Sequence, residues 1–330
     1  MTSKVAIIGA GNVGTTTAFA LLLSGLSSEI VLVDVDRARC EGEAMDLSHI
    51  QAFTFGTQIR SGDFSDCAHA SIVILTAGKN QKPGQSRLDL LQENAAIVQE
   101  IVPQIVHYIT NPILLVATNP VDPLTYAAWK LSGLPPQRVI GSGTIVDSAH
   151  FRYLLGHHFG INPQSVHAYI IGEHGDSEVP LWSLTNIAGI HLRAFCEHEG
   201  IAWDEPSLEA IFRDARDAAN EIIRLKGETQ YAIASGLVRI VEAIMRNENS
   251  VLTVSTVAEH YGIPLVALSL PTRINSKGAD RVLHLPLTEQ ELAALVRSAE
   301  VIRTAIATMN PNSVIAHNSA KHSTKSKARC

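Results

Sequence analysis

A glycine-rich string near the start of the chain follows directly on a short apolar run. The run is 5–8, and the string is Gly9-Ala10-Gly11-Asn12-Val13-Gly14. A GxGxxG string between a strand and a helix predicts a nucleotide-binding turn, in which the second glycine lets a pyrophosphate approach the backbone. Asp34 ends the next apolar run about 20 residues further on, where an acid can bind both ribose hydroxyls and repel a 2′-phosphate. The pattern favours NAD over NADP, although Arg37 and Arg39 weaken that preference.

Apolar runs and amphipathic stretches alternate through the first half of the chain. The β-branched runs predict strands that are buried on both faces, and the stretches between several of them predict helices. The expected strands are 5–8, 30–34, 72–76, 113–117 and 139–140, and the expected helices are 12–26, 87–109 and 123–131. Such repetition with right-handed crossovers predicts an α/β fold with a Rossmann-type doubly wound parallel sheet.

The second half of the chain predicts a mixed α+β catalytic domain. Its expected helices are 147–159, 205–225, 229–246 and 288–309, and its expected strands are 166–171, 251–257, 265–270 and 282–285. Glycines loosen the chain at 141–143, and the boundary is placed there. We expect an NAD-binding Rossmann domain at 1–142, a catalytic and substrate domain at 143–310 and a flexible basic tail at 311–330.

Charge and composition argue against several classes of protein. The 330 residues carry a net charge of −6 and lack the basic excess of a nucleic-acid-binding protein. No apolar run approaches the roughly 20 residues that span a bilayer, and the run at 5–8 begins too early to follow a secretory leader. The four cysteines have neither paired nor metal-like spacing. We expect a cytoplasmic protein with no metal site, whose partners include neither nucleic acid nor membrane.

A histidine lies between glycines just after a predicted strand, in Gly172-Glu173-His174-Gly175-Asp176. A lone histidine is more often structural than catalytic. Asp147, however, opens a predicted helix, and a carboxylate bonded to the imidazole would set its tautomer and stabilise its charged form. Such a histidine can donate the proton that accompanies hydride transfer to a ketone.

Seven ordered motifs carry a resemblance over nearly the whole chain. They are the glycine string, TAG at 76–78, QKPGQSRLDL at 81–90, TNPVD at 118–122, GSGT at 141–144, GEHGD at 172–176 and KGET at 226–229. With these motifs the chain resembles the lactate dehydrogenases of the lactate and malate dehydrogenase superfamily. The resemblance implies NAD as cofactor and a small 2-keto or 2-hydroxy acid as substrate, most simply pyruvate and L-lactate.

The resemblance also implies a role for individual residues. His174 would be the acid and base, Asp147 its partner, and Arg87 a cation on a closing loop that polarises the keto oxygen. Asn119 would assist at that oxygen, and Thr229 would line the substrate side. The residues implied to contact NAD are Gly9, Gly11, Asn12, Val13, Gly14, Asp34, Arg39, Thr76, Ala77, Gly78, Ala117, Asn119 and Ser142.

Two positions bear on the choice of substrate. Gln81 stands where malate-type members have an arginine for the second carboxylate, and a neutral amide cannot supply that ion pair. His150 stands where the family pattern has an arginine that holds the substrate carboxylate. An imidazole offers one directed bond at most, whereas a guanidinium is always charged and forked. Either 2-keto acids bind weakly, or the substrate is not a simple 2-keto acid.

Arg152 and His167 match another feature of the resemblance. Bacterial members that fructose 1,6-bisphosphate activates have an arginine and a histidine at these two places. The resemblance therefore implies an anion site between subunits, allosteric regulation in glycolysis and a homotetramer. The alternative is that both residues are ordinary surface residues.

Three other hypotheses remain open on the sequence. One is a divergent relative that reduces a different 2-keto acid or an imine, because of His150. Another is a protein that binds NAD without turnover. The third is a malate dehydrogenase, against which Gln81 argues.

Overall fold

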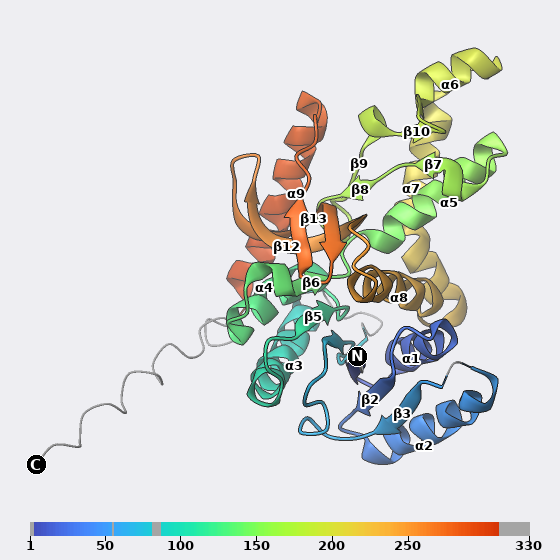
Figure 1. Cartoon of the computed structure of the whole chain (residues 1–330). Coiled ribbons are helices and arrows are strands. Elements are labelled where there is room, and N and C mark those ends of the chain that lie inside the picture. Colours follow the sequence, from blue (N-terminus) through green and yellow to red (C-terminus); the bar gives the residue numbers. More distant parts are fainter. Residues whose placement is uncertain (1–2, 55, 81–86, 310–330) are drawn as a thin grey trace, which may run out of the picture.

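The computed structural model describes residues 3–54, 56–80 and 87–309 (Figure 1). Its main feature is a nine-stranded sheet with the strand order β14-β13-β12-β6-β5-β4-β1-β2-β3. Six of these strands pair in parallel, and they are β1 (Lys4–Ile8), β2 (Glu29–Val33), β3 (Gln58–Ser61), β4 (Ile72–Leu75), β5 (Ile113–Val116) and β6 (Val139–Gly141). The order reverses on either side of β1, so the predicted doubly wound parallel sheet is confirmed.

Helices cover both faces of the parallel strands because successive side chains of a strand point to opposite faces. On β1, Val5 and Ile7 pack into one apolar cluster, and Ala6 and Ile8 pack into another. The first cluster includes side chains from α1, α2 and α8, and the second includes side chains from α3 and α4. The bounds are α1 Asn12–Ser24, α2 Arg37–Ser48, α3 Arg87–Tyr108, α4 Val121–Ser132 and α8 Tyr231–Met245. Strand β3 and helix α2 were not among the expected elements.

The long strands of the second half extend the same sheet instead of forming their own. They are β12 (Ser250–His260), β13 (Ile263–Asn275) and β14 (Gly278–Val282), and they run antiparallel to one another. Strand β12 pairs antiparallel with β6 at Ser255–Gly141 and Thr256–Ile140. This pairing joins the two halves of the chain through one continuous sheet.

Several expected strands differ in their bounds. Strands β12 and β13 are longer than the expected runs 251–257 and 265–270, and two other runs are broken or cut short. The run 166–171 is broken into β7 (Val166–His167) and β8 (Ile170–Ile171), because the first pairs with β10 and the second with β9. The run 282–285 is not a strand beyond Val282. The backbone amide of Leu285 donates to the Tyr261 hydroxyl at 2.6 Å, so it has no strand neighbour as its partner.

The remaining elements surround β7 and β8 or close the chain. They are α5 (Ile145–Phe159), β9 (Val179–Pro180), β10 (Asn186–Ile187), β11 (Ile190–His191), α6 (Leu192–Glu199), α7 (Glu205–Lys226) and α9 (Glu289–Thr308). Helix α9 begins with a capping box, in which Thr288 and Glu291 each bond the backbone amide of the other. The expected tail at 311–330 lies outside the described residues. Among the described helices, none combines the length and apolarity needed to cross a membrane.

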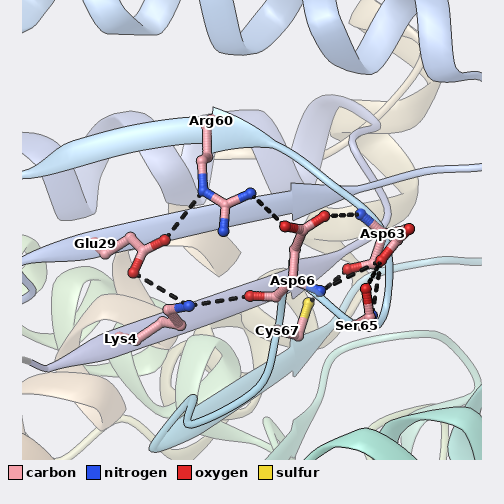
Figure 2. A network of polar contacts seen from close by, with 7 residues as sticks. All are labelled: Lys4, Glu29, Arg60, Asp63, Ser65, Asp66 and Cys67. Carbon is pink, nitrogen blue, oxygen red and sulfur yellow. Dashed lines mark hydrogen bonds and ion pairs between the residues drawn. The ribbon is translucent and has the colours of Figure 1, made fainter.

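Charged side chains join the strands near the amino ends of β1 and β2 (Figure 2). Glu29 pairs with Lys4 at 3.2 Å and with Arg60 at 3.1 Å, so it links β1, β2 and β3. Arg60 also pairs with Asp66 at 2.8 Å, and Lys4 donates to the Asp66 carbonyl at 3.0 Å. Ligands of doubly wound sheets bind at the opposite, carboxyl edge. We therefore assign this network to stability.

Candidate functional site

The glycine turn between β1 and α1 lies open at the carboxyl edge of the sheet. Gly9 has φ +112°, which disfavours any residue with a side chain, and its amide donates to the Val33 carbonyl at 2.8 Å. A Cβ on Gly14 would overlap the Gly9 carbonyl oxygen, whereas a Cβ on Gly11 would meet nothing within 4 Å. The space at Gly11 faces the first amides of α1, so the turn fits the diphosphate of a dinucleotide.

Asp34 is held against this turn at the end of β2. Its Oδ2 accepts from the amide of Ala10 at 2.6 Å, and its Oδ1 accepts from the amide of Asp36 at 2.9 Å. Each carboxylate oxygen retains lone pairs for further donors. The position fits a carboxylate that binds the hydroxyls of an adenosine ribose.

Arg39 and Glu228 reach the same turn from other elements. Arg39 donates to Oδ1 of Asn12 at 3.2 Å, and Asn12 donates in turn to Glu228. Asn12 begins α1, and Glu228 belongs to the segment between α7 and α8. A link therefore runs from the glycine turn to the residue next to Thr229.

Three further strand ends complete the edge. After β4, the Thr76 hydroxyl donates to the Gly9 carbonyl at 2.8 Å, and Ala77 and Gly78 follow it. After β5, the amide of Ala117 donates to the Leu75 carbonyl at 2.9 Å, and after β6 the amide of Ser142 donates to the Val116 carbonyl at 2.8 Å. All the residues predicted to contact NAD thus lie at or beside the carboxyl ends of the parallel strands, except Arg39, which reaches them from α2.

Asn94, which was not among the predicted site residues, is fully buried on α3. Its side chain accepts from the amide of Lys79 at 2.7 Å and donates to the carbonyl of Asn119 at 2.7 Å. Asn94 therefore ties the segment after β4 to the segment after β5. In the sequence, Asn94 is a polar residue among the apolar positions of the expected helix 87–109. A buried polar side chain needs hydrogen-bond partners, and this pattern could have indicated its role.

His174 and Asp147 meet across two elements. Asp147 lies in the first turn of α5, and its Oδ2 lies 2.6 Å from Nδ1 of His174, three residues beyond β8. A carboxylate only accepts hydrogen bonds, so Nδ1 carries the proton and Nε2 is the atom that titrates. The side chain of His174 is 27% exposed, which leaves Nε2 room to meet a substrate.

The hairpin that carries His174 is held by its neighbours. Gly172 exchanges two backbone hydrogen bonds with Ser269 of β13, at 2.9 and 3.0 Å. The amide of Glu173 donates to the hydroxyl of Ser298 on α9 at 2.7 Å, and the amide of His174 donates to Oδ2 of Asp122 on α4 at 2.8 Å. These contacts pre-orient the imidazole before substrate binds.

Carboxyl groups raise the pKa of His174 to about 9. The largest cause is the negative charge of Asp147, and Asp122 and Glu178 act in the same direction, while burial opposes them. Burial raises the pKa of Asp122 itself to about 6. His174 is therefore protonated at pH 7 and is ready to act as an acid.

The predicted substrate residues occupy different parts of the same region. Asn119 precedes Pro120 through a cis peptide bond at the start of α4, and Thr229 lies between α7 and α8. His150 lies one turn after Asp147 on α5, where its ring stacks on Tyr153 with 6.2 Å between centroids. Gln81 lies outside the described residues. For Arg87, the structure describes only its place as the first residue of α3.

Arg152 lies on α5, and His167 lies on β7, which contacts α5. Arg152 donates to the carbonyls of Pro163 and Gln164 at 3.2 and 3.5 Å. Its buried Nε has no hydrogen-bond partner within the described ranges. His167 is exposed on β7, two residues after the short helix Pro163–Ser165.

Comparisons with known proteins agree with this arrangement. Residues 3–141 match the NAD-binding domain of lactate/malate dehydrogenase, and residues 144–311 match the alpha/beta C-terminal domain of the same family. The chain belongs to the lactate/malate dehydrogenase family. It is therefore an NAD-binding oxidoreductase by family.

Similar proteins within the family are lactate dehydrogenases. A probable L-lactate dehydrogenase of Schizosaccharomyces pombe is 50% identical over 309 residues, which cover 94% of each chain. The L-lactate dehydrogenase of Moorella thermoacetica is 51% identical, covering 93% of this chain and 98% of its own. The crystal structure of a minor L-lactate dehydrogenase from Enterococcus mundtii superposes with a TM-score of 0.90 at 40% identity, covering 94% of this chain and 99% of the other.

Proposed function

We propose that the chain is an NAD-dependent L-lactate dehydrogenase that interconverts pyruvate and L-lactate. The observation that carries the proposal is the 2.6 Å contact of His174 with Asp147, in a chain whose glycine turn fits the diphosphate of NAD. The names of the similar proteins support the same substrate pair.

Different residues of the chain have different roles in the reduction of pyruvate. Bound NADH supplies the hydride, and His174 donates the Nε2 proton to the oxygen that becomes the hydroxyl. Asp147 stabilises the imidazolium before transfer and keeps the neutral tautomer correct afterwards. Arg87 and Asn119 would polarise the keto group, and Thr229 and Gln81 would line the side of the pocket that faces the substrate's carbon chain.

The test is NADH oxidation by purified protein with pyruvate and with oxaloacetate as alternative substrates. We expect pyruvate to be preferred, because Gln81 supplies no charge for a second carboxylate. We also expect NADH to be preferred over NADPH, and Asp34→Ser to narrow that difference. Preference for oxaloacetate would assign the chain to the malate branch of its family.

His150 favours a second candidate, in which the native substrate carries a different group where pyruvate has its carboxylate. In His150→Arg, a forked cation replaces a single weak contact, so the KM for pyruvate should fall at least tenfold, which requires about 1.4 kcal/mol. If pyruvate is native, the variant is the better enzyme. If another ketone or an imine is native, the same change improves pyruvate and damages the native reaction. An unchanged KM would show that residue 150 does not face the substrate.

Assembly and regulation form the last part of the proposal. The end of α7 exposes Ile222, Ile223 and Leu225 to the extent of 40%, 48% and 69%, which supports burial against another subunit. We propose a homotetramer in the cytoplasm, with Arg152 and His167 binding fructose 1,6-bisphosphate between subunits as an allosteric activator of this step of glycolysis. Sedimentation and kinetics with millimolar sugar phosphate test both statements, and no change in either would leave the two residues a structural role.

The domain division is proposed in the same terms. Residues 1–142 would bind NAD, 143–310 would bind the 2-keto acid, and 311–330 would form a basic tail. The link from Asn12 to Glu228 supports cooperation between the first two, because it joins the glycine turn to the segment of Thr229.

A further inference from the structure

Glu178 is an enclosed carboxyl group in the hairpin of His174. It is the last residue before β9 and is only 7% exposed. Its Oε1 is shielded from solvent and has no hydrogen-bond partner in the part of the chain that the structure describes. Enclosing an ionised carboxylate without partners is costly, and the group takes up a proton instead.

Charged groups reach Glu178 from several elements. Asp147 on α5 and Asp217 on α7 disfavour its ionised form, whereas His174 and Arg216 favour it. Arg216 also pairs with Asp217 at 2.9 Å, which offsets much of its charge. Asp122 on α4 and Asp176 in the hairpin face His174 and Arg216, respectively. Burial and the nearby Asp147 together raise the pKa of Glu178 to about 9.

We propose that Glu178 is a positioning residue: enclosed without a partner for Oε1, it adds no charge beside His174 at neutral pH and supplies one when the medium becomes alkaline. The inference rests on the proposed role of His174 as proton donor. At pH 7 a neutral Glu178 leaves Asp147 as the carboxylate that directly pairs with the imidazolium. His174 can therefore still release its proton to the substrate.

The coupling matters when the medium becomes alkaline. Two ionisable groups that interact lose their protons in steps that belong to the pair. The first proton leaves Glu178 in part of the molecules, and in those the new carboxylate stabilises the His174 imidazolium. Glu178 thus extends pyruvate reduction to higher pH than Asp147 alone would allow.

Glu178→Gln tests this idea, because glutamine has nearly the same shape and cannot ionise. We expect kcat/KM for pyruvate to stay within about twofold of the original at pH 7. The apparent pKa above which kcat/KM decreases should fall by about half to one unit, which is the shift that a single nearby charge produces. Activity at pH 9.5 should then be about three to ten times lower than in the unaltered protein.

Glu300→Gln is the matched control, since it removes an exposed carboxylate on α9. Its pH profile should coincide with that of the unaltered protein. If Glu178→Gln lowers kcat/KM by the same factor at every pH, Glu178 only stabilises the hairpin, and the proposal is overturned. An unchanged apparent pKa for the decrease of kcat/KM in alkaline medium would also overturn it.

Infrared spectroscopy checks the protonation state without turnover. At pH 8, where Asp122 with a pKa of about 6 is ionised, the unaltered protein should show the C=O stretch of a protonated carboxylic acid. The band should disappear by pH 11 and be absent from Glu178→Gln. Absence of the band in the unaltered protein overturns the proposal even if the variant fails to fold.

His174→Gln separates this inference from the proposed function. An inactive His174→Gln with an unshifted Glu178→Gln rejects only the role of Glu178. Normal turnover in His174→Gln rejects the proton donor itself.

Discussion

At the scale of the residue, His174 owes its chemistry to its neighbours. Its pKa of about 9 depends first on Asp147, which lies 27 positions away in the sequence. An isolated histidine, with a pKa near 6.5, would be mostly neutral at pH 7. The contact at 2.6 Å therefore keeps His174 protonated, and so able to donate a proton, at neutral pH.

Asp147→Asn should remove the main cause of the raised pKa while keeping an acceptor for Nδ1. Reduction needs the protonated imidazole, so its rate should begin to fall at lower pH, by about two units. The value of kcat/KM should then drop about twofold at pH 7 and about tenfold at pH 8. The pH profile of pyruvate reduction measures this shift. Asp46→Asn, an exposed change on α2, should leave the profile unmoved, and an unshifted profile in Asp147→Asn would deny Asp147 its electrostatic role.

Gly14→Ala should weaken NADH binding by at least tenfold, because its Cβ would overlap the Gly9 carbonyl and force the turn open. Gly42→Ala is the control, since Gly42 lies on α2 with nothing within 4 Å of an added Cβ. The control should raise the free energy of unfolding by about 0.5–1 kcal/mol through helix propensity. Fluorescence titration with NADH and urea unfolding measure the two effects. Unchanged NADH affinity in Gly14→Ala would contradict the proposed diphosphate site.

At the scale of the element, strand ends have two different tasks. Their carboxyl ends carry the candidate site. The amino ends of β1 and β2 carry Lys4 and Glu29, which form a network with Arg60 and Asp66 (Figure 2). The hydrogen bond from the Asp63 amide and the ion pair with Arg60 lower the pKa of Asp66. A lowered folded-state pKa adds stability that is present above the unfolded value and is lost as the pH falls through the folded value.

Arg60→Met should lower the free energy of unfolding at pH 7 by about 0.5–1 kcal/mol, because exposed ion pairs contribute little. The difference from the unaltered protein should shrink in 1 M salt and as the pH falls below about 3.8. Urea unfolding measures it, and NADH affinity should not change. A loss of NADH affinity would show that this edge of the sheet communicates with the site.

At the scale of the whole molecule, three groups with raised pKa values lie around one site. Asp122, His174 and Glu178 all bind protons more tightly in the folded chain than in the unfolded one. For His174 the added stability is full below about pH 6.5 and is lost as the pH rises through about 9. Glu178 acts in the same direction up to about pH 9, whereas the effect of Asp122 is complete near pH 6. His174 and Glu178 therefore make the fold less stable as the medium becomes alkaline.

We therefore expect the free energy of unfolding to fall between pH 6 and pH 9. His174→Gln should show a decrease smaller by about 2 kcal/mol, since one pKa unit corresponds to about 1.4 kcal/mol. Urea unfolding at constant protein concentration measures both chains, because subunit association would also change the apparent stability. If the free energy of unfolding decreases equally in both proteins, folding does not raise the pKa of His174.

Local sequence patterns were sufficient to predict much of the fold. Five of the six parallel strands, the glycine turn and Asp34 could be predicted from the sequence, because hydrophobic periodicity and glycine geometry act between residues close along the chain. The same holds for the start of α9 at Thr288, where the cap and Glu291 are three residues apart. The family resemblance added the roles of residues such as Asn119 and Arg87, which no local pattern indicates.

Contacts between distant segments decided the rest. The break between β7 and β8, the entry of β12 into the main sheet, and the burial of Asn94, Asp122 and Glu178 follow from tertiary contacts that sequence patterns do not encode. Burial is the physical reason in the case of Glu178, because the pKa of its carboxyl group rises only after the surrounding elements have removed its water. The sequence by itself determined which residues could do the chemistry. The tertiary structure alone decided their protonation states, because charge and solvation depend on what surrounds each group.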